Sequence, residues 1–216
     1  AHPARRADDQ QAPPVAYGRA PEDCAALPSA GTAAAQILGG TAVRDGRSLL
    51  VIGAAGGVGS FLTQLAAARS IGVVAAVRGD EKRRMAALGA AATVDTTAGP
   101  DELASAVADL YPEGVDALVD LVSTDPAAFA THTALVRDGG VAVTTRGVPG
   151  PPGVARVDFR LDPADPAGEL LGALAEGAVR GELRVPIDVE LPLEKAPQAL
   201  AQNRAGGARG KTVFVI

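Results

Sequence analysis

The stretch that decides the fold of this chain is Leu49-Leu50-Val51-Ile52-Gly53-Ala54-Ala55-Gly56-Gly57-Val58-Gly59. Its apolar start, Leu49–Ile52, predicts a buried strand, and residues 58–70 then repeat apolar side chains at helical spacing. A second apolar run, rich in β-branched residues, follows over Val73–Val77. Strand, glycine-rich turn, helix and strand in this order predict one parallel βαβ unit.

A glycine-rich turn in this position is typical of a site for a dinucleotide pyrophosphate. Residues without side chains let the backbone approach the phosphates, and the helix N-terminus offers free N–H groups and the positive end of its dipole. We expect Gly56 to give this access and Gly59 to let the helix pack on the sheet. Ala54 stands where the commonest fingerprint has its first glycine, and a turn of this kind without a ligand is the structural alternative.

The alternation of strands and helices continues along the chain, with a turn predicted at Asp138-Gly139-Gly140 and a less regular carboxyl-terminal part. Repeated βα units predict the fold class α/β, a Rossmann-type doubly wound parallel sheet. The further predicted strands are 93–94, 117–122, 141–145, 157–161 and 212–216, and the further predicted helices are 81–88, 102–110, 127–135 and 168–177.

The amino-terminal part divides the chain into two segments. Residues 1–24 begin Pro-rich, polar and aperiodic, and we interpret them as a tail or linker remnant. A helix is expected over 25–41, so residues 25–216 are predicted to form one Rossmann domain with a C-terminal return segment. The tail has no apolar run of the kind found in signal peptides or membrane helices, which favours a cytoplasmic protein.

Composition excludes several classes of partner. The net charge of −5 and the pI near 5.1 disfavour a nucleic-acid or anionic-membrane surface, because both partners attract basic faces. One cysteine, Cys24, and two histidines, His2 and His132, leave few of the usual zinc ligands, so no metal site is expected. A small-molecule partner remains the prediction.

Arg78 indicates which dinucleotide binds. NAD-binding sheets carry an acidic residue about 20 residues after the glycine turn, at the end of the second strand, whereas an arginine there accepts a 2′-phosphate. Here Arg78 follows Val77, and Lys82 and its basic neighbours open the next helix, where positive charge is unfavourable unless an anion is present. These residues predict NADPH and disfavour a methyltransferase, whose sheet normally ends its second strand with an acid. A solvated basic helix face is the alternative.

A second glycine-rich run, over residues 205–212, resembles a phosphate-binding P-loop with Ala205 in place of the first glycine. A P-loop joins a strand to a following helix. Here a helix-like segment comes before the run and the apolar residues Val213–Ile216 come after it. We therefore interpret the resemblance as accidental.

Taken together, these residues resemble the zeta-crystallin-like quinone oxidoreductases, zinc-independent members of the medium-chain dehydrogenase/reductase superfamily. The resemblance runs from about Cys24 to Ile216. The matching segments are Ala25-Ala26-Leu27-Pro28, Gly31-Thr32-Ala33-Ala34, Gly53–Gly59, Leu88-Gly89-Ala90, Val115–Asp120, Gly139-Gly140, Leu191–Ala196 and Arg209-Gly210-Lys211.

The resemblance implies a reductase that transfers hydride from NADPH to a quinone or to an activated alkene or enone. The cofactor would lie across the carboxyl ends of the strands, with the glycine turn on its pyrophosphate and the later strand ends on its nicotinamide. His132 and the two tyrosines, Tyr17 and Tyr111, are interpreted as structural or surface residues, and no catalytic side chain is predicted. The predicted cofactor-binding residues are Ala55, Gly56, Gly57, Val58, Gly59, Arg78, Lys82, Thr96, Val122, Ser123, Thr145 and Arg146.

The resemblance also raises a question about domain organisation. Members of this family begin with a GroES-like β domain that closes over the nicotinamide, and no such run precedes Ala25. Three explanations stay open: the chain is a fragment, another chain supplies the domain, or the domain has been lost. In the last case the chain would be a non-catalytic NADPH-binding module, a sensor or an assembly partner. The late strand 157–161 predicts a homodimer through a sheet edge, unless Pro149–Pro152 cover that edge.

Overall fold

The computed structural model describes residues 21–150, 155–158, 167–206 and 208–216. Its main sheet has six parallel strands in the order β3-β2-β1-β4-β5-β6, so the strand order reverses between β1 and β4. This sheet confirms the predicted α/β, Rossmann-like fold. The strands are β1 Ser48–Ile52, β2 Gly72–Val77, β3 Ala92–Asp95, β4 Val115–Asp120, β5 Val136–Thr144 and β6 Ala155–Asp158.

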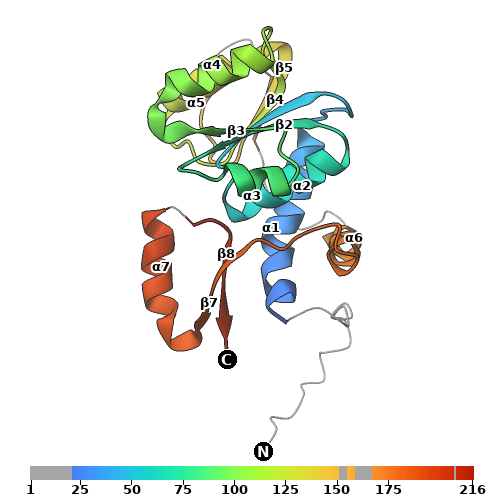
Figure 1. The fold of residues 1–216 in the computed structure, drawn as a ribbon, viewed down its shortest axis with the longest axis vertical. Coiled ribbons are helices and arrows are strands. Elements are labelled where there is room, and N and C mark those ends of the chain that lie inside the picture. The colour runs from blue at the N-terminus through green and yellow to red at the C-terminus, as the bar shows by residue number, and fades with distance from the viewer. Residues whose placement is uncertain (1–20, 151–154, 159–166, 207) are drawn as a thin grey trace, which may run out of the picture.

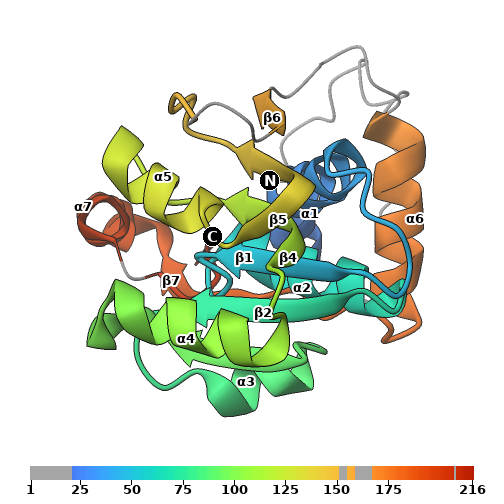
Figure 2. The same ribbon diagram turned by 90° about the horizontal axis from the view of Figure 1, so that it is seen from above.

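Helices cover both faces of this sheet (Figure 1). Figure 1 places α4 above the sheet and α6 below it, whereas Figure 2 looks down on the strands from the α4 side; the two helices contribute to different cores, Leu103 to one and Leu174 to the other. The helices are α1 Pro21–Gly40, α2 Gly57–Ala68, α3 Lys82–Ala87, α4 Pro100–Leu110, α5 Pro126–Thr133, α6 Ala167–Val179 and α7 Ala196–Ala205. Helix α1 thus starts at Pro21, ahead of the predicted domain start at Ala25.

The apolar run of β1 forms the centre of the molecule, because every residue of this strand is buried. Successive side chains point to opposite faces of a strand. Leu49 and Val51 accordingly join the core under α1 and α2, whereas Leu50 and Ile52 join the core under α4 and α5. A strand buried on both faces reads as a continuous apolar run, which is why its sequence predicted it correctly.

The turn predicted at Asp138–Gly140 is wrong, because these residues lie inside β5. Val136 pairs with Val115 and Val141 pairs with Ala117, so the four residues between them face a single partner residue and form a bulge. Gly139 has a φ of +72°, and a Cβ on Gly140 would lie 2.8 Å from the carbonyl oxygen of Asp116. The glycines that resembled a turn therefore serve a bulged strand.

The C-terminal part leaves the main sheet. Strands β7 Ile187–Pro192 and β8 Lys211–Val215 form a separate two-stranded parallel sheet, and α7 lies beside it (Figure 1). The sequence prediction missed β7, although Ile187-Asp188-Val189-Glu190 alternates apolar and polar residues as strands do. No helix in the described part of the chain combines the length and apolar character that crossing a membrane requires.

The edge of the main sheet is formed by β6, which covers part of the strand predicted over 157–161. Residues 159–161 lie outside the described residues, as do Pro151 and Pro152 of the segment that was weighed as a cover. The homodimer through this edge stays a prediction.

We predict that Gly59→Ala destabilises the fold. A Cβ there would overlap the carbonyl oxygen of Gly53 and lie 2.6 Å from Ala54 Cα, and these backbone atoms have little room to retreat. The expected loss in the free energy of unfolding is roughly 1–3 kcal/mol, measured by urea denaturation. Gly172→Ala is the matched control, because nothing lies within 4 Å of its added Cβ in α6. Equal unfolding midpoints for the two variants would contradict the close approach.

Candidate functional site

A cleft of about 440 Å³ lies at the carboxyl ends of the main strands. It opens where the strand order reverses beside β1, the place where sheets of this type bind ligands. Five of the predicted cofactor-binding residues meet there: Ala55, Gly56, Arg78, Thr96 and Val122. The other lining residues are Ile52, Gly53, Ala76, Val77, Glu81, Gly206, Ala208 and Arg209.

A larger hollow, of about 960 Å³, lies at the other end of the same strands, where β1, β2 and β4 begin. Its polar groups are bonded to one another: Asp116 accepts hydrogen bonds from Ser48 Oγ at 2.8 Å and from Arg137 Nε at 2.8 Å. Tyr111 lines the same hollow, and burial, followed by the charge of Asp116, raises the pKa of its hydroxyl. We interpret this region as structural, because its buried acid, Asp116, is already bonded to Ser48 and Arg137.

The glycine turn is held open by its own backbone. Gly53 has a φ of +83°, and a Cβ there would lie 2.6 Å from Val122 Cγ1, so only glycine fits at the end of β1. The N–H groups of Gly53 and Ala54 both donate to the carbonyl oxygen of Ala76, which ties the turn to β2. Helix α2 then starts with Gly56 as its N-cap, without a side-chain capping bond. Its first N–H groups are therefore available to an anion.

The C-terminal segment passes close to this turn. A Cβ on Gly57 would lie 3.0 Å from Lys211 Cδ, and Gly206, Ala208 and Arg209 form part of the cleft wall. Val58 and Gly59 belong to the first turn of α2 and do not line the cleft. The segment that resembled a P-loop thus contributes to the cleft as a loop between α7 and β8.

The ends of β2 and β3 form the side of the cleft that carries Arg78 and Thr96. Arg78 is exposed directly after β2, and Thr96 Oγ1 donates to the carbonyl oxygen of Val77 at 3.0 Å. Asp95 accepts from the N–H of Thr97 and also from that of Gly79, and these bonds lower the pKa of its carboxyl. Lys82 opens α3, as predicted, but is not among the residues that line the cleft.

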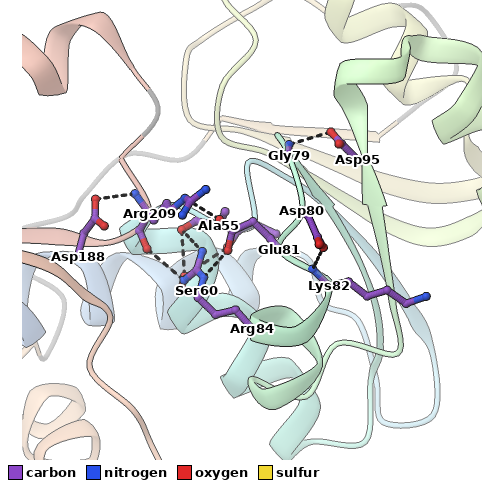
Figure 3. A network of polar contacts seen from close by, with 11 residues as sticks. Ala55, Ser60, Gly79, Asp80, Glu81, Lys82, Arg84, Asp95, Asp188 and Arg209 are labelled. Carbon is purple, nitrogen blue, oxygen red and sulfur yellow. Dashed lines mark hydrogen bonds and ion pairs between the residues drawn. The ribbon is translucent and has the colours of Figure 1, made fainter.

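A polar network that the sequence did not predict adjoins this wall (Figure 3). Its centre is Glu81, whose side chain is only 4% exposed. Arg84 Nε lies 2.6 Å from Glu81 Oε2, and Arg209 Nε lies 2.7 Å from Glu81 Oε1. Arg84 also donates to the carbonyl oxygen of Ala55 at 2.8 Å. The pair of Glu81 and Arg84 could have been predicted, because residues three apart are neighbours on a helix. The contact of Glu81 with Arg209 could not, because Arg209 is far from Glu81 in the chain.

The end of β4 carries a second buried carboxylate, Asp120. Asp120 Oδ1 accepts the N–H groups of Val122 and Ser123, and Oδ2 lies 2.8 Å from His132 Nδ1 in α5. Because an ionised carboxylate only accepts hydrogen bonds, this ring nitrogen carries the proton. Burial acts to raise the pKa of Asp120, but the bond from His132 and those from Ser123 and Val122 outweigh it and hold the pKa below its ordinary value of 3.8.

The remaining predicted residues lie beside Asp120 but outside the cleft lining. Ser123 is buried, and its Oγ lies 3.4 Å from His132 Nδ1. The N–H of Thr145 donates to the carbonyl oxygen of Asp120 at 3.4 Å, and the N–H of Arg146 donates to Thr144 Oγ1. These contacts place the ends of β4 and β5 side by side, as the parallel sheet requires.

Comparisons with known proteins give both a family and a set of similar folds. A family model described as zinc-binding dehydrogenase matches residues 88–214. The 2-methylene-furan-3-one reductase of Solanum lycopersicum is 32% identical over 196 residues, which are 89% of this chain and 46% of that protein. The chain spans less than half the length of the curated relatives it matches.

Solved structures share the fold at low sequence identity. A quinone oxidoreductase from Coxiella burnetii superimposes with a TM-score of 0.75 at 24% identity, over 88% of this chain and 59% of that one. A mycobacterial protein solved in complex with NADPH has a TM-score of 0.78 at 24% identity, over 92% of this chain and 65% of that one.

We predict that Asp120→Asn lowers stability by about 1.5–3 kcal/mol at pH 7, the range for a hydrogen-bonded buried charge. Because the pKa of Asp120 is lowered on folding, this stability is present above pH 3.8 and is lost as the pH falls through the lower folded value. The gap between wild type and variant should therefore be constant near neutrality and shrink below pH 3.8. Urea denaturation across this range measures the gap, and Asp109→Asn, at an exposed carboxylate, is the control. A gap that does not change with pH would refute the assignment.

Proposed function

Since the chain belongs to the zinc-binding dehydrogenase family, we propose that it is the cofactor-binding part of an NADPH-dependent oxidoreductase that transfers hydride to a quinone or an activated alkene. The observation that carries this proposal is that the glycine turn and Arg78 line the same cleft. The reductase from Solanum lycopersicum and the quinone oxidoreductase fold support the substrate class.

The residues present fit a dinucleotide. Gly56 has its nearest potential Cβ contact at 3.5 Å, on the carbonyl oxygen of Gly53, so the cradle in front of α2 is space that a side chain would fill. The uncapped N-terminus of α2 supplies N–H donors for a pyrophosphate. Ala55, Gly56, Gly57 and Val58 would hold that group, with Thr96 toward the adenosine and Val122 toward the nicotinamide.

NADPH rather than NADH is favoured by the charges around Arg78. An acid at the end of β2 would bind the ribose hydroxyls of NADH, and that position is occupied by Arg78. The acid that does line the cleft, Glu81, is already paired with two arginines. Lys82 starts α3 but does not line the cleft, so the preference for NADPH is assigned to Arg78.

In the proposed reaction the nicotinamide supplies the hydride. The chain itself would orient the cofactor and keep the site dry. Ser123, Thr145 and Arg146, at the ends of β4 and β5, are proposed for the nicotinamide side. Zinc independence belongs to the same proposal and rests on the scarcity of soft ligands, with Cys24, His2 and His132 as the chain's whole supply.

We predict that Arg78→Ala weakens NADPH binding by roughly 10–100-fold, equivalent to the loss of one charge-assisted hydrogen bond. NADH binding should change little, because NADH lacks the 2′-phosphate. Calorimetric titration of both dinucleotides against wild type and variant measures the effect. Arg44→Ala, at an exposed arginine before β1, is the matched control. Equal losses for both dinucleotides would contradict the assignment of Arg78 to the phosphate.

A turnover screen with quinones and enones tests the rest of the proposal. We expect NADPH oxidation that depends on both the acceptor and Arg78. Selective NADPH binding without turnover would instead support a non-catalytic binding module. The absence of binding to either dinucleotide would refute the proposed function.

A further inference from the structure

Glu81 holds two arginines in very different ways. Arg84 is fixed through its whole guanidinium: Nε bonds Glu81 Oε2, Nη2 donates to the carbonyl oxygen of Ala55, and Nη1 donates to the carbonyl oxygen of Arg209 at 3.1 Å and to Ser60 Oγ at 3.3 Å. A guanidinium with this many partners in fixed backbone is structural. Arg84 thus pairs with Glu81 and braces the glycine turn.

Arg209 is held more loosely. Its Nε lies 2.7 Å from Glu81 Oε1, yet its side chain is 62% exposed. Glu81 Oε1 is buried and accepts no hydrogen bond among the described residues, so the contact with Arg209 is an ion pair without good hydrogen-bond alignment. The Arg209 side chain therefore keeps most of its five N–H donors for another partner.

The backbone around Arg209 carries this side chain to the cleft. The N–H of Arg209 donates to Asp188 Oδ2 at 3.0 Å in β7, and its carbonyl oxygen accepts from Arg84. Figure 3 shows Arg209 anchored on both sides by these contacts. Arg209 lines the same cleft as Arg78 and Thr96. Two arginines, one from the end of β2 and one from the C-terminal loop, therefore line the same cleft.

We propose that Arg209 is a specificity-determining residue that exchanges its ion pair with Glu81 for the 2′-phosphate of NADPH, which it binds together with Arg78. This inference rests on the proposed function. A phosphate oxygen pair matches the planar fork of a guanidinium, whereas Glu81 offers one poorly aligned oxygen. The exchange leaves Glu81 with Arg84, so the buried carboxylate keeps a cation.

The exchange gives the C-terminal loop a part in choosing the cofactor. NADH has no 2′-phosphate, so Arg209 stays on Glu81 when NADH binds. Discrimination between the two dinucleotides therefore depends on Arg209, a residue of the C-terminal loop that is far from Arg78 in the chain.

The test separates the phosphate from the rest of the dinucleotide. Arg209→Ala, Arg209→Lys, Arg44→Ala and wild type are titrated with NADPH, NADH, 2′,5′-ADP and 5′-AMP. For Arg209→Ala we expect a loss of roughly 10-fold or more for NADPH and 2′,5′-ADP, from one charged hydrogen bond, and almost unchanged affinity for NADH and 5′-AMP. Arg209→Lys should retain part of the affinity, and Arg44→Ala should behave as wild type.

Two outcomes would overturn the inference alone. Equal weakening of NADPH and NADH by Arg209→Ala would make Arg209 a structural residue, and an unchanged preference for NADPH would remove it from the phosphate site. Both leave the proposed function intact if wild type prefers NADPH. Failure of wild type to bind NADPH and 2′,5′-ADP would overturn the proposed function and this inference together. Circular dichroism melts of each variant verify that the Arg209 variants fold.

Discussion

The constraint on which the rest of the structure depends is the close approach of the first turn of α2 to the end of β1. Gly59 has no room for a Cβ against Gly53 and Ala54, and Gly53 has none against Val122. This packing aims the N-terminus of α2 at the carboxyl edge of the sheet. Because β2 and β4 flank β1, their ends then supply the two walls of the cleft.

A buried carboxylate lies on each side of that turn, Glu81 on one side and Asp120 on the other. Glu81 connects the glycine turn, α3 and the C-terminal loop through Arg84 and Arg209. Removing a carboxylate from water is costly, and the cost is offset only when opposite charges and hydrogen bonds surround it. Such a network holds Arg84 and the glycine turn in place and leaves Arg209 more loosely paired.

On the other side of the turn, beside the cleft, Asp120 fixes the backbone of Val122 and Ser123 and orients the ring of His132. The residues at this end come from β4, α5 and the end of β5, so they are distant in the chain from the residues around Arg78. The parallel sheet brings both sets to one edge. On each side of the glycine turn, a buried acid thus positions the groups around it.

The sequence by itself determined the elements whose signals are local. Leu49–Ile52 is a buried strand because it is apolar on both faces, the glycine turn is defined by its own residues, and Arg78 follows directly from the end of β2. The local signal misled where the same residues serve two structures, as at Asp138–Gly140, where glycines that fit a turn form a bulge instead.

Only the tertiary structure decided which charges meet. Arg209 pairs with Glu81, and Asp188 holds the backbone of Arg209, through contacts between separate elements. His132 meets Asp120 because α5 packs beside β4. No spacing along the chain encodes such pairs, since they depend on the register of the sheet and on the path of the C-terminal loop, which are settled by the packing of the whole core.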